Sequence, residues 1–270
     1  MPSSPIVGMV DRLESSGAGP TPAEIEFVMA YLADGPMDPA MLGRLADPKL
    51  ASEREARIAE LRARDWPNLG QYRDANAAAP TPAKAVFMGD SLTEFWSAAD
   101  PDLFTGGVVG RGISGQTSPQ MLLRFMADVV ALKPSCVHIL CGANDIAGNT
   151  GPNTFGDYTG NVSAMIVLAK AHGAQVILGN LPRFAGFSWA PAIQPAPWVT
   201  RINSWLAETC EAHGLILADY AAPLEGGTGF LRPDLTRDGV HPTAAGYRVM
   251  RPVAEAALAR ALATPVVARP

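Results

Sequence analysis

The sequence has few cysteines, and they lack the spacing of a disulfide framework or a metal site. Only three occur among 270 residues. Cys136 and Cys141 lie at the two ends of one apolar stretch, and an extended strand would hold them too far apart to bridge. Neither Cys-x-x-Cys nor His-x-x-x-His is present. We therefore expect buried thiols, and the usual structural zinc sites are excluded.

Clusters of basic residues and long apolar runs are also missing. The formal net charge is −5, from 26 acidic and 21 basic residues, which argues against a surface for nucleic acids or anionic membranes. No stretch is long enough to span a membrane, and residues 1–11 contain no basic leader. We therefore expect a cytoplasmic protein that binds neither nucleic acid nor membrane. An exported protein whose leader had been removed would have the same sequence.

Short and long apolar segments alternate after residue 80. The short runs predict strands near 84–88, 107–110, 136–141, 175–179 and 215–218. The longer segments predict helices near 119–131, 155–172, 198–213 and 243–262. Strands and helices that alternate through short connections form a parallel sheet between helical layers. The prediction for residues 81–270 is a three-layer α/β fold with a flavodoxin-like, doubly wound, five-stranded parallel sheet.

The first 80 residues have a different pattern and predict a helical extension. Thr21-Pro22-Ala23-Glu24 is a capping box with proline in the first turn, so a helix is predicted from there to about Gly35. Asp38-Pro39 and Asp47-Pro48 repeat the start signal of a helix.

The helix predicted after Asp47 has an apolar and a charged face. Leu50 belongs to the face expected to point inward, whereas Glu53–Arg57 and Glu60–Arg64 are expected to form ion pairs on the solvent face. Three roles are open for the apolar faces of this extension. They could pack on the α/β domain, join copies of the chain into a homo-oligomer, or border a binding site.

Ser91 follows the first predicted strand in Gly89-Asp90-Ser91, and a helix is predicted to begin near Thr93. Ser91 would then lie where parallel α/β sheets bind ligands, at a helix N-terminus that favours negative charge. Alternatively, Ser91 only caps the helix. Asp90 is expected to hold the loop by accepting backbone hydrogen bonds, with its side chain opposite to that of Ser91.

A serine nucleophile needs a base and a group that orients the base. Among four histidines, His241 has a carboxylate three residues upstream, Asp238, so one loop could carry both groups. His138 lies inside an apolar strand, and the other two histidines precede glycines at predicted helix ends. We therefore predict His241 as the base and Asp238 as the orienting group. Asp219, at the end of the last strand, is the rival of Asp238.

Two loops are candidates for stabilising an oxyanion. Residues 110–117 are too glycine-rich for regular structure, and Gly115 leaves its backbone N–H unobstructed. Asn144 follows another predicted strand, so its amide would emerge at the same edge of the sheet as Ser91. The predicted oxyanion donors are the N–H groups of Ser91 and Gly115 and the amide of Asn144. Alternatively, each loop is only a turn.

In this order, the motifs resemble those of the SGNH or GDSL hydrolases. The four blocks correspond to Gly89-Asp90-Ser91-Leu92, the Gly115 loop, Gly142-Ala143-Asn144-Asp145 and Asp238-Gly239-Val240-His241. The longer runs 112–117 and 238–247 are similar to the bacterial branch that includes relatives of platelet-activating-factor acetylhydrolase subunits and carbohydrate acetylesterases. The resemblance does not extend to the first 80 residues.

The resemblance implies a carboxylic ester hydrolase that acts through a Ser91 acyl-enzyme and requires no cofactor. Its substrate would be a small-molecule ester of a short acyl group, with acetylated carbohydrate as the leading class. A lysophospholipase or thioesterase using the same residues is the alternative. A binding module for acylated sugars is a third hypothesis, which the presence of every catalytic residue type disfavours. No Gly-x-Ser-x-Gly occurs, which argues against the α/β-hydrolase nucleophile elbow.

One long connection, residues 180–197, contains several aromatic residues and four prolines. A long loop of this kind is often functional, and its composition favours a stiff wall beside the site. The candidate substrate-binding residues are Phe187, Trp189 and Ile193 from this loop, with Phe95 and Trp96 from the first helix of the domain. Alternatively, these side chains only pack the loop onto the core.

Overall fold

The computed structural model describes residues 19–33, 35, 38, 41 and 47–264. Its centre is a parallel sheet whose strands follow the order β2-β1-β3-β4-β5. All five strands were predicted, and they span β1 Ala85–Gly89, β2 Val108–Gly112, β3 Cys136–Leu140, β4 Gln175–Gly179 and β5 Ile216–Ala218. This is the flavodoxin-like order. The predicted three-layer α/β fold is therefore confirmed.

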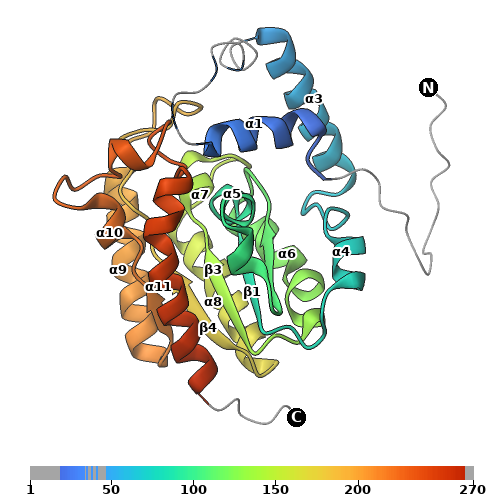
Figure 1. Cartoon of the computed structure of the whole chain (residues 1–270), viewed down its shortest axis with the longest axis vertical. Helices are drawn as coiled ribbons and strands as arrows, with labels where there is room; N and C mark the ends of the chain where they lie inside the picture. The colour runs from blue at the N-terminus through green and yellow to red at the C-terminus, as the bar shows by residue number, and fades with distance from the viewer. Residues whose placement is uncertain (1–18, 34, 36–37, 39–40, 42–46, 265–270) are drawn as a thin grey trace.

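Alternation of side chains along the strands divides the core into two halves. Phe87 of β1 belongs to the half that contains α5 and α11, whereas Val86 and Met88 belong to the half that contains α6, α8 and α9. These helices span α5 Ser91–Ala99, α6 Ser118–Asp128, α8 Phe155–Ala171, α9 Ala196–His213 and α11 Ala244–Ala263. Both faces of the sheet are thereby covered (Figure 1), as a parallel sheet requires.

Shorter helices complete the connections between these elements. They span α4 Arg73–Ala78, α7 Ala143–Ala147 and α10 Ala221–Glu225, with 3₁₀ turns η1 Pro101–Phe104, η2 Val130–Leu132 and η3 Pro233–Leu235. The three cysteines are buried and unpaired. Among the described helices, none combines the length and the apolarity that crossing a membrane would require.

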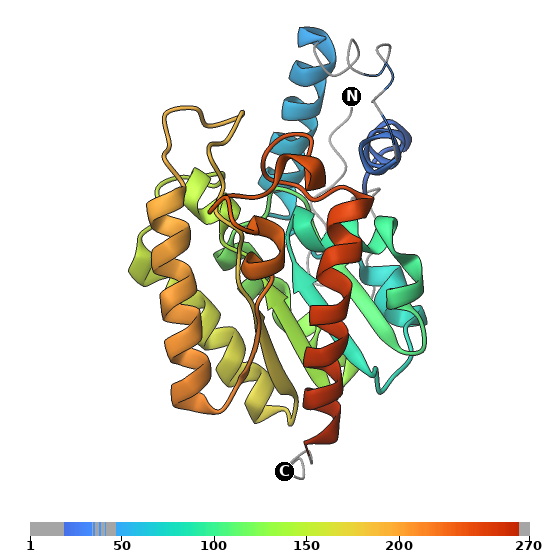
Figure 2. The ribbon, with the colours of Figure 1, turned by 60° about the vertical axis from the view of Figure 1, so that its left-hand side comes forward.

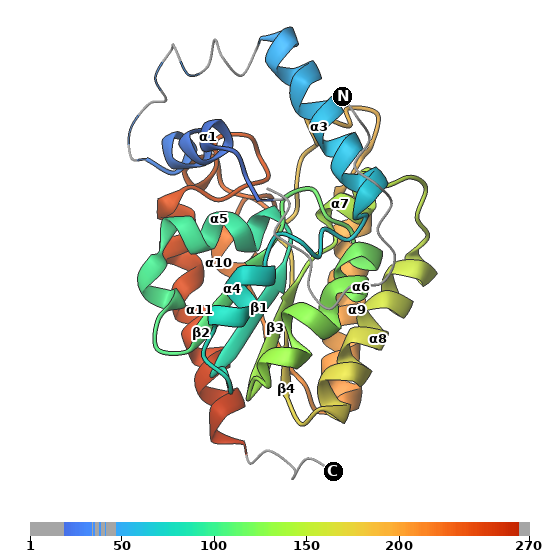
Figure 3. The ribbon, with the colours of Figure 1, turned by 90° about the vertical axis from the view of Figure 1, so that its right-hand side faces the viewer.

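Two helices precede the α/β part of the chain, α1 Pro22–Leu32 and α3 Pro48–Arg64. Both lie beyond one end of the sheet, the end from which the loop 180–195 also projects (Figures 2 and 3). The predicted capping box is present, because Thr21 and Glu24 bond to each other's backbone N–H groups. The helix ends at Leu32 instead of Gly35. Most of the start predicted at 38–39 lies outside the described residues.

The charged and apolar faces predicted for α3 are partly wrong. Leu50 is 43% exposed instead of pointing inward. Arg57 bonds to Glu24 of α1 instead of Glu53, because α1 lies within reach of it. The Glu60–Arg64 pair is confirmed at 2.7 Å.

Candidate active site

Ser91 occupies the junction of β1 and α5, and the helix begins there, two residues before the start near Thr93 that the sequence predicted. It is the first residue of α5, and Asp90 is its N-cap, accepting the Leu92 N–H at 2.9 Å. The loop-holding role predicted for Asp90 is therefore confirmed. Only glycine fits at position 89, immediately before Asp90, because a Cβ there would lie 2.0 Å from the hydroxyl oxygen of Thr93. The backbone is thereby held tightly where Ser91 leaves the strand.

Ser91, His241 and Asp238 form one chain of hydrogen bonds, although Ser91 and His241 are 150 residues apart in sequence. The Ser91 hydroxyl lies 2.8 Å from Nε2 of His241. Nδ1 of the same ring lies 2.6 Å from Oδ2 of Asp238. This arrangement can move the serine proton to the imidazole while the carboxylate stabilises the resulting cation.

The Asp238 carboxylate is held in its charged form. Its burial alone would raise its pKa, but the hydrogen bond and charge of His241, with the N–H groups of His241 and Val240, hold the pKa well below its usual range. Those two N–H groups bond to Oδ1 at 2.8 and 2.9 Å, which leaves Oδ2 for the ring. We therefore assign the proton of His241 to Nδ1, so that Nε2 can accept the serine proton.

Asp219, the rival for this role, is engaged elsewhere. Its Oδ1 accepts hydrogen bonds from the Asn180 amide at 2.7 Å and from the Ala222 N–H at 3.2 Å. These contacts place it at the start of α10, where it connects β5 to the loop after β4. The geometry thus brings Asp238, and not Asp219, to the imidazole.

Two of the predicted oxyanion donors, the backbone N–H groups of Ser91 and Gly115, have no hydrogen-bond acceptor among the described residues. Gly115 has a φ of +76°, a conformation that favours glycine. Asn144, the third predicted donor, lies in α7 and bonds through Nδ2 to Oδ2 of Asp90 at 3.2 Å and to the Gln116 carbonyl at 3.0 Å. Its amide would therefore have to exchange one of these bonds for a bond to an oxyanion.

Asn149, which the sequence reasoning missed, orients the Asn144 amide. Its own amide donates to Oδ1 of Asn144 at 2.7 Å and accepts from the Trp189 indole N–H at 3.0 Å. Oδ1 of Asn144 is therefore occupied, and its Nδ2 must face Asp90. The only signal in the sequence was an asparagine between two glycines, Gly148 and Gly151, a composition typical of a turn.

The candidate substrate-binding residues differ widely in exposure. Trp189 is 43% exposed, and its ring lies 6.3 Å from that of His241. Phe95 is buried and stacks on the His241 ring at 4.9 Å. Phe187 is buried beneath Trp189 at 4.9 Å, and Ile193 packs on the core. Of the two loop aromatics, only Trp189 therefore offers substantial surface to a substrate.

Trp96 was wrongly assigned to the substrate-binding surface. Its side chain is fully buried and packs against Phe87, Tyr220 and Tyr247 in the core. Successive residues of a helix point about 100° apart. Phe95 can therefore face His241 while Trp96 faces the sheet.

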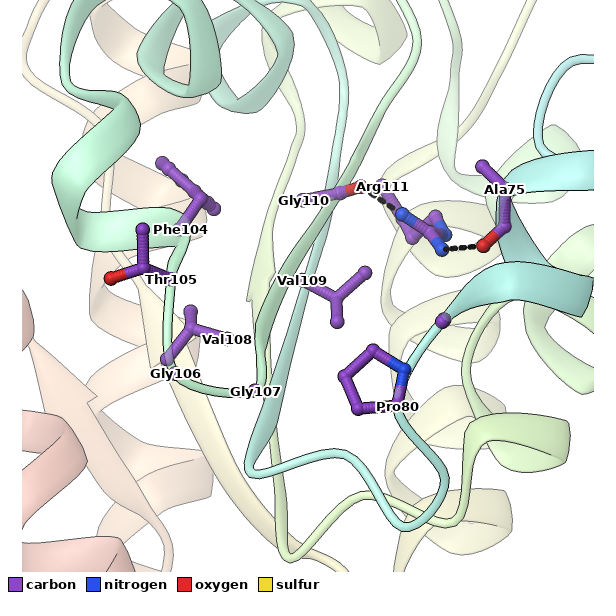
Figure 4. A pocket seen from close by; sticks show the side chains of 11 residues that line it. Ala75, Pro80, Phe104, Thr105, Gly106, Gly107, Val108, Val109, Gly110 and Arg111 are labelled. Carbon is purple, nitrogen blue, oxygen red and sulfur yellow. Dashed lines mark hydrogen bonds between the residues drawn. The ribbon is translucent and has the colours of Figure 1, made fainter.

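A shallow hollow of about 400 Å³ lies beside the edge strand β2, between Pro80 and Phe104 (Figure 4). None of Ser91, His241 and Asp238 lines this hollow. The candidate site is therefore located by the hydrogen bonds among these three residues and not by the hollow. Within the part of the chain that the structure describes, no three His, Cys, Asp or Glu side chains gather in a way that could hold a metal ion.

Comparison with known proteins agrees with this fold. The model of the GDSL-like lipase/acylhydrolase family matches residues 87–249, and the chain belongs to this family. A search of curated proteins found no match.

Solved structures include similar proteins from two Bacteroides species. One from Bacteroides fragilis is 41% identical, with a TM-score of 0.70, over 73% of this chain and 99% of that chain. A GDSL-like lipase from Bacteroides thetaiotaomicron is 40% identical, with a TM-score of 0.70, over 73% and 100%. An acetylxylan esterase from Geobacillus stearothermophilus shares the fold at 20% identity and a TM-score of 0.51, over 70% and 98%. Family membership makes this protein a hydrolase that acts on esters.

Proposed function

We propose that the protein is a serine esterase that transfers a short acyl group from an ester to water through an acyl-enzyme on Ser91. The observation that carries this proposal is the chain of hydrogen bonds from Ser91 through His241 to Asp238, at 2.8 and 2.6 Å. A serine hydroxyl is a weak nucleophile until a positioned base takes its proton. In this proposal His241 is that base, and the charged carboxylate of Asp238 fixes its orientation.

The reaction would proceed in two halves. Oγ of Ser91 attacks the acyl carbon while its proton passes to Nε2 of His241, and the tetrahedral intermediate then releases the alcohol, which takes that proton. Water next attacks the acyl-enzyme, giving a proton to His241. The ester bond to Oγ breaks, the serine regains its proton, and the carboxylic acid leaves.

The negative charge of each tetrahedral intermediate would fall on one oxygen beside Ser91. Within the described part of the chain, the N–H groups of Ser91 and Gly115 have no acceptor, so they would be available to this oxygen. The N-terminus of α5 adds its dipole. The Asn144 amide would contribute most in the transition state, since its present partners, Asp90 and Gln116, must yield one hydrogen bond as the charge develops.

Short acyl groups fit the surroundings of His241 better than long ones. Trp189 is fixed by its indole hydrogen bond to Asn149 and by stacking on Phe187, so it forms a stiff wall. Acetylxylan esterases are among the proteins with this fold, which supports acetylated carbohydrate as the leading substrate class. The alternative is a lysophospholipase or thioesterase that uses the same residues.

The test is a series of initial rates on p-nitrophenyl esters from acetate to palmitate, beside acetate release from acetylated sugars. A pocket for long chains would gain about fourfold in kcat/KM per buried methylene. We expect a maximum between acetate and butyrate, followed by a decline. Trp189→Ala should flatten the decline, whereas Trp198→Ala, a similarly exposed tryptophan on α9, should keep it. A wild-type maximum at octanoate or longer would favour the alternative.

A further inference from the structure

Helix α1 contacts the loop that carries Asp238 and His241. The hydroxyl oxygen of Tyr31 lies 2.7 Å from the carbonyl oxygen of His241 and 3.0 Å from Oδ1 of Asp238, so its proton can bond to either. The same hydroxyl accepts the N–H of Arg237 at 3.0 Å. Tyr31 is only 3% exposed. A side chain from the N-terminal extension is therefore bonded directly to the acidic and basic residues of the proposed site.

Arg237 fastens the loop to α1 from the other side. Its guanidinium donates hydrogen bonds to three carbonyl oxygens at the end of this helix, those of Tyr31, Ala33 and Gly35, at 2.7, 2.6 and 2.6 Å. Carbonyls at a helix C-terminus lack partners within the helix, and a cation there is favourable. The helix end and the loop thus fix each other, and Tyr31 is held in place at the contact.

The ring and the hydroxyl of Tyr31 make separate contacts. The ring packs against Phe95 at 6.0 Å and edge-on against His241 at 6.2 Å. The hydroxyl alone reaches Asp238. Burial, followed by the charge of Asp238, raises the pKa of Tyr31 well above its usual value, so the hydroxyl is a neutral donor at physiological pH. Removing only the oxygen atom therefore leaves the packing in place.

We propose that Tyr31 is a positioning residue for the reaction, and that the N-terminal extension completes the active site of this esterase. The inference rests on the proposed function. With Tyr31 and the loop N–H groups on Oδ1, the Asp238 carboxylate presents Oδ2 to His241 in one orientation. This proposal takes up the third alternative that the sequence left open for the extension, namely that it borders a binding site.

The comparisons agree with the view that the N-terminal extension is an addition to the part of the chain that the family shares. The matching family model begins at residue 87, well after Tyr31. The Bacteroides fragilis structure is covered over 99% of its length but accounts for 73% of this chain. Part of this chain therefore has no counterpart in that protein, and the blocks of the family do not include the Tyr31 contact.

The experiment compares Tyr31→Phe with wild type in the full chain. We expect kcat on p-nitrophenyl acetate to fall about tenfold or more, the size of one lost hydrogen bond to a charged group, with KM within about twofold. Arg237→Gln, which releases the end of α1, should lower kcat in the same way. Tyr158→Phe is the matched control, because it removes another buried hydroxyl, one bonded to the Cys141 carbonyl, and should leave kcat within about twofold.

Two further readouts separate positioning from general stability and from the proposed function. The melting temperatures of Tyr31→Phe and Tyr158→Phe should be similar. The rate at which a fluorophosphonate labels Ser91 should fall in Tyr31→Phe in parallel with kcat. Wild-type labelling at Ser91 with unchanged kcat and labelling rate in Tyr31→Phe would overturn the role of Tyr31 alone. Absence of Ser91 labelling in the active wild-type enzyme would overturn the proposed function itself.

Discussion

Replacing Asp238 with asparagine would keep the shape of this side chain and remove its ability to orient His241. Oδ1 could still accept the N–H groups of Val240 and His241, so the loop should keep its conformation. The new amide nitrogen would take the place of Oδ2, 2.6 Å from Nδ1, so a group that carries hydrogens would face the ring nitrogen in place of an oxygen that accepts one. The imidazole would then carry its proton on Nε2, which could no longer accept the proton of Ser91.

The magnitude follows from losing the correct tautomer. The same substitution in the serine protease triad lowers kcat about 10⁴-fold, which corresponds to about 5 kcal/mol of transition-state stabilisation. Asp238 makes the same contact with its imidazole here, so we expect kcat to fall about 10³–10⁴-fold. Asp219→Asn is the matched control and should cost only a few-fold in kcat.

The assay is steady-state hydrolysis of p-nitrophenyl acetate by the two purified variants, with circular dichroism to confirm that both are folded. A large loss confined to Asp219→Asn would refute the reasoning and transfer the orienting role. Small and equal losses in both variants would also refute it, because they would indicate a Ser91–His241 pair oriented by a backbone group.

Three further predictions concern the polar groups around Ser91. Asn144→Ala should lower kcat by about 10²–10³ with a nearly unchanged KM, and a raised KM at normal kcat would make it a substrate-binding residue. Asn149→Ala should lower kcat less than Asn144→Ala does. Because both substitutions act on the Asn144 amide, the variant that carries both should lose less kcat than the product of the two single losses, and full additivity would contradict this. Burial raises the pKa of Asp90 from 3.8 to about 7, so the folded protein holds a proton that the unfolded chain has lost. The contribution of Asp90 to the free energy of unfolding should therefore fall as pH rises from 3.8 to 7, and Asp90→Asn should reduce that fall in urea titrations; an unchanged slope would count against it.

The sequence was sufficient to predict the fold and to place Ser91 and Asn144 at the same edge of the sheet, and the reason is physical. Parallel strands end on one edge, so motifs that each follow an apolar run, such as those of Ser91 and Asn144, converge there. His241 could be added because its carboxylate partner lies three residues away. These inferences need only local patterns and one topological rule.

Groups brought in by tertiary packing could not be predicted in the same way. Tyr31 lies 207 residues before Asp238, and in a helix an apolar aromatic ring is typical of core packing. Trp96 was misassigned because the sequence does not fix the rotation of α5 against the sheet. Arg57 exchanged its predicted partner on α3 for one on α1 because the position of one helix against another is not encoded by spacing within either.

The central claim is that Ser91 carries the acyl group during turnover. The most direct measurement is acid quenching of the enzyme during hydrolysis of p-nitrophenyl acetate, followed by mass spectrometry of the intact chain and of its peptides. The account predicts one added acetyl group per chain, located on Ser91, and none in Ser91→Ala. An acetyl group on a different residue during turnover, or full activity in Ser91→Ala, would contradict it.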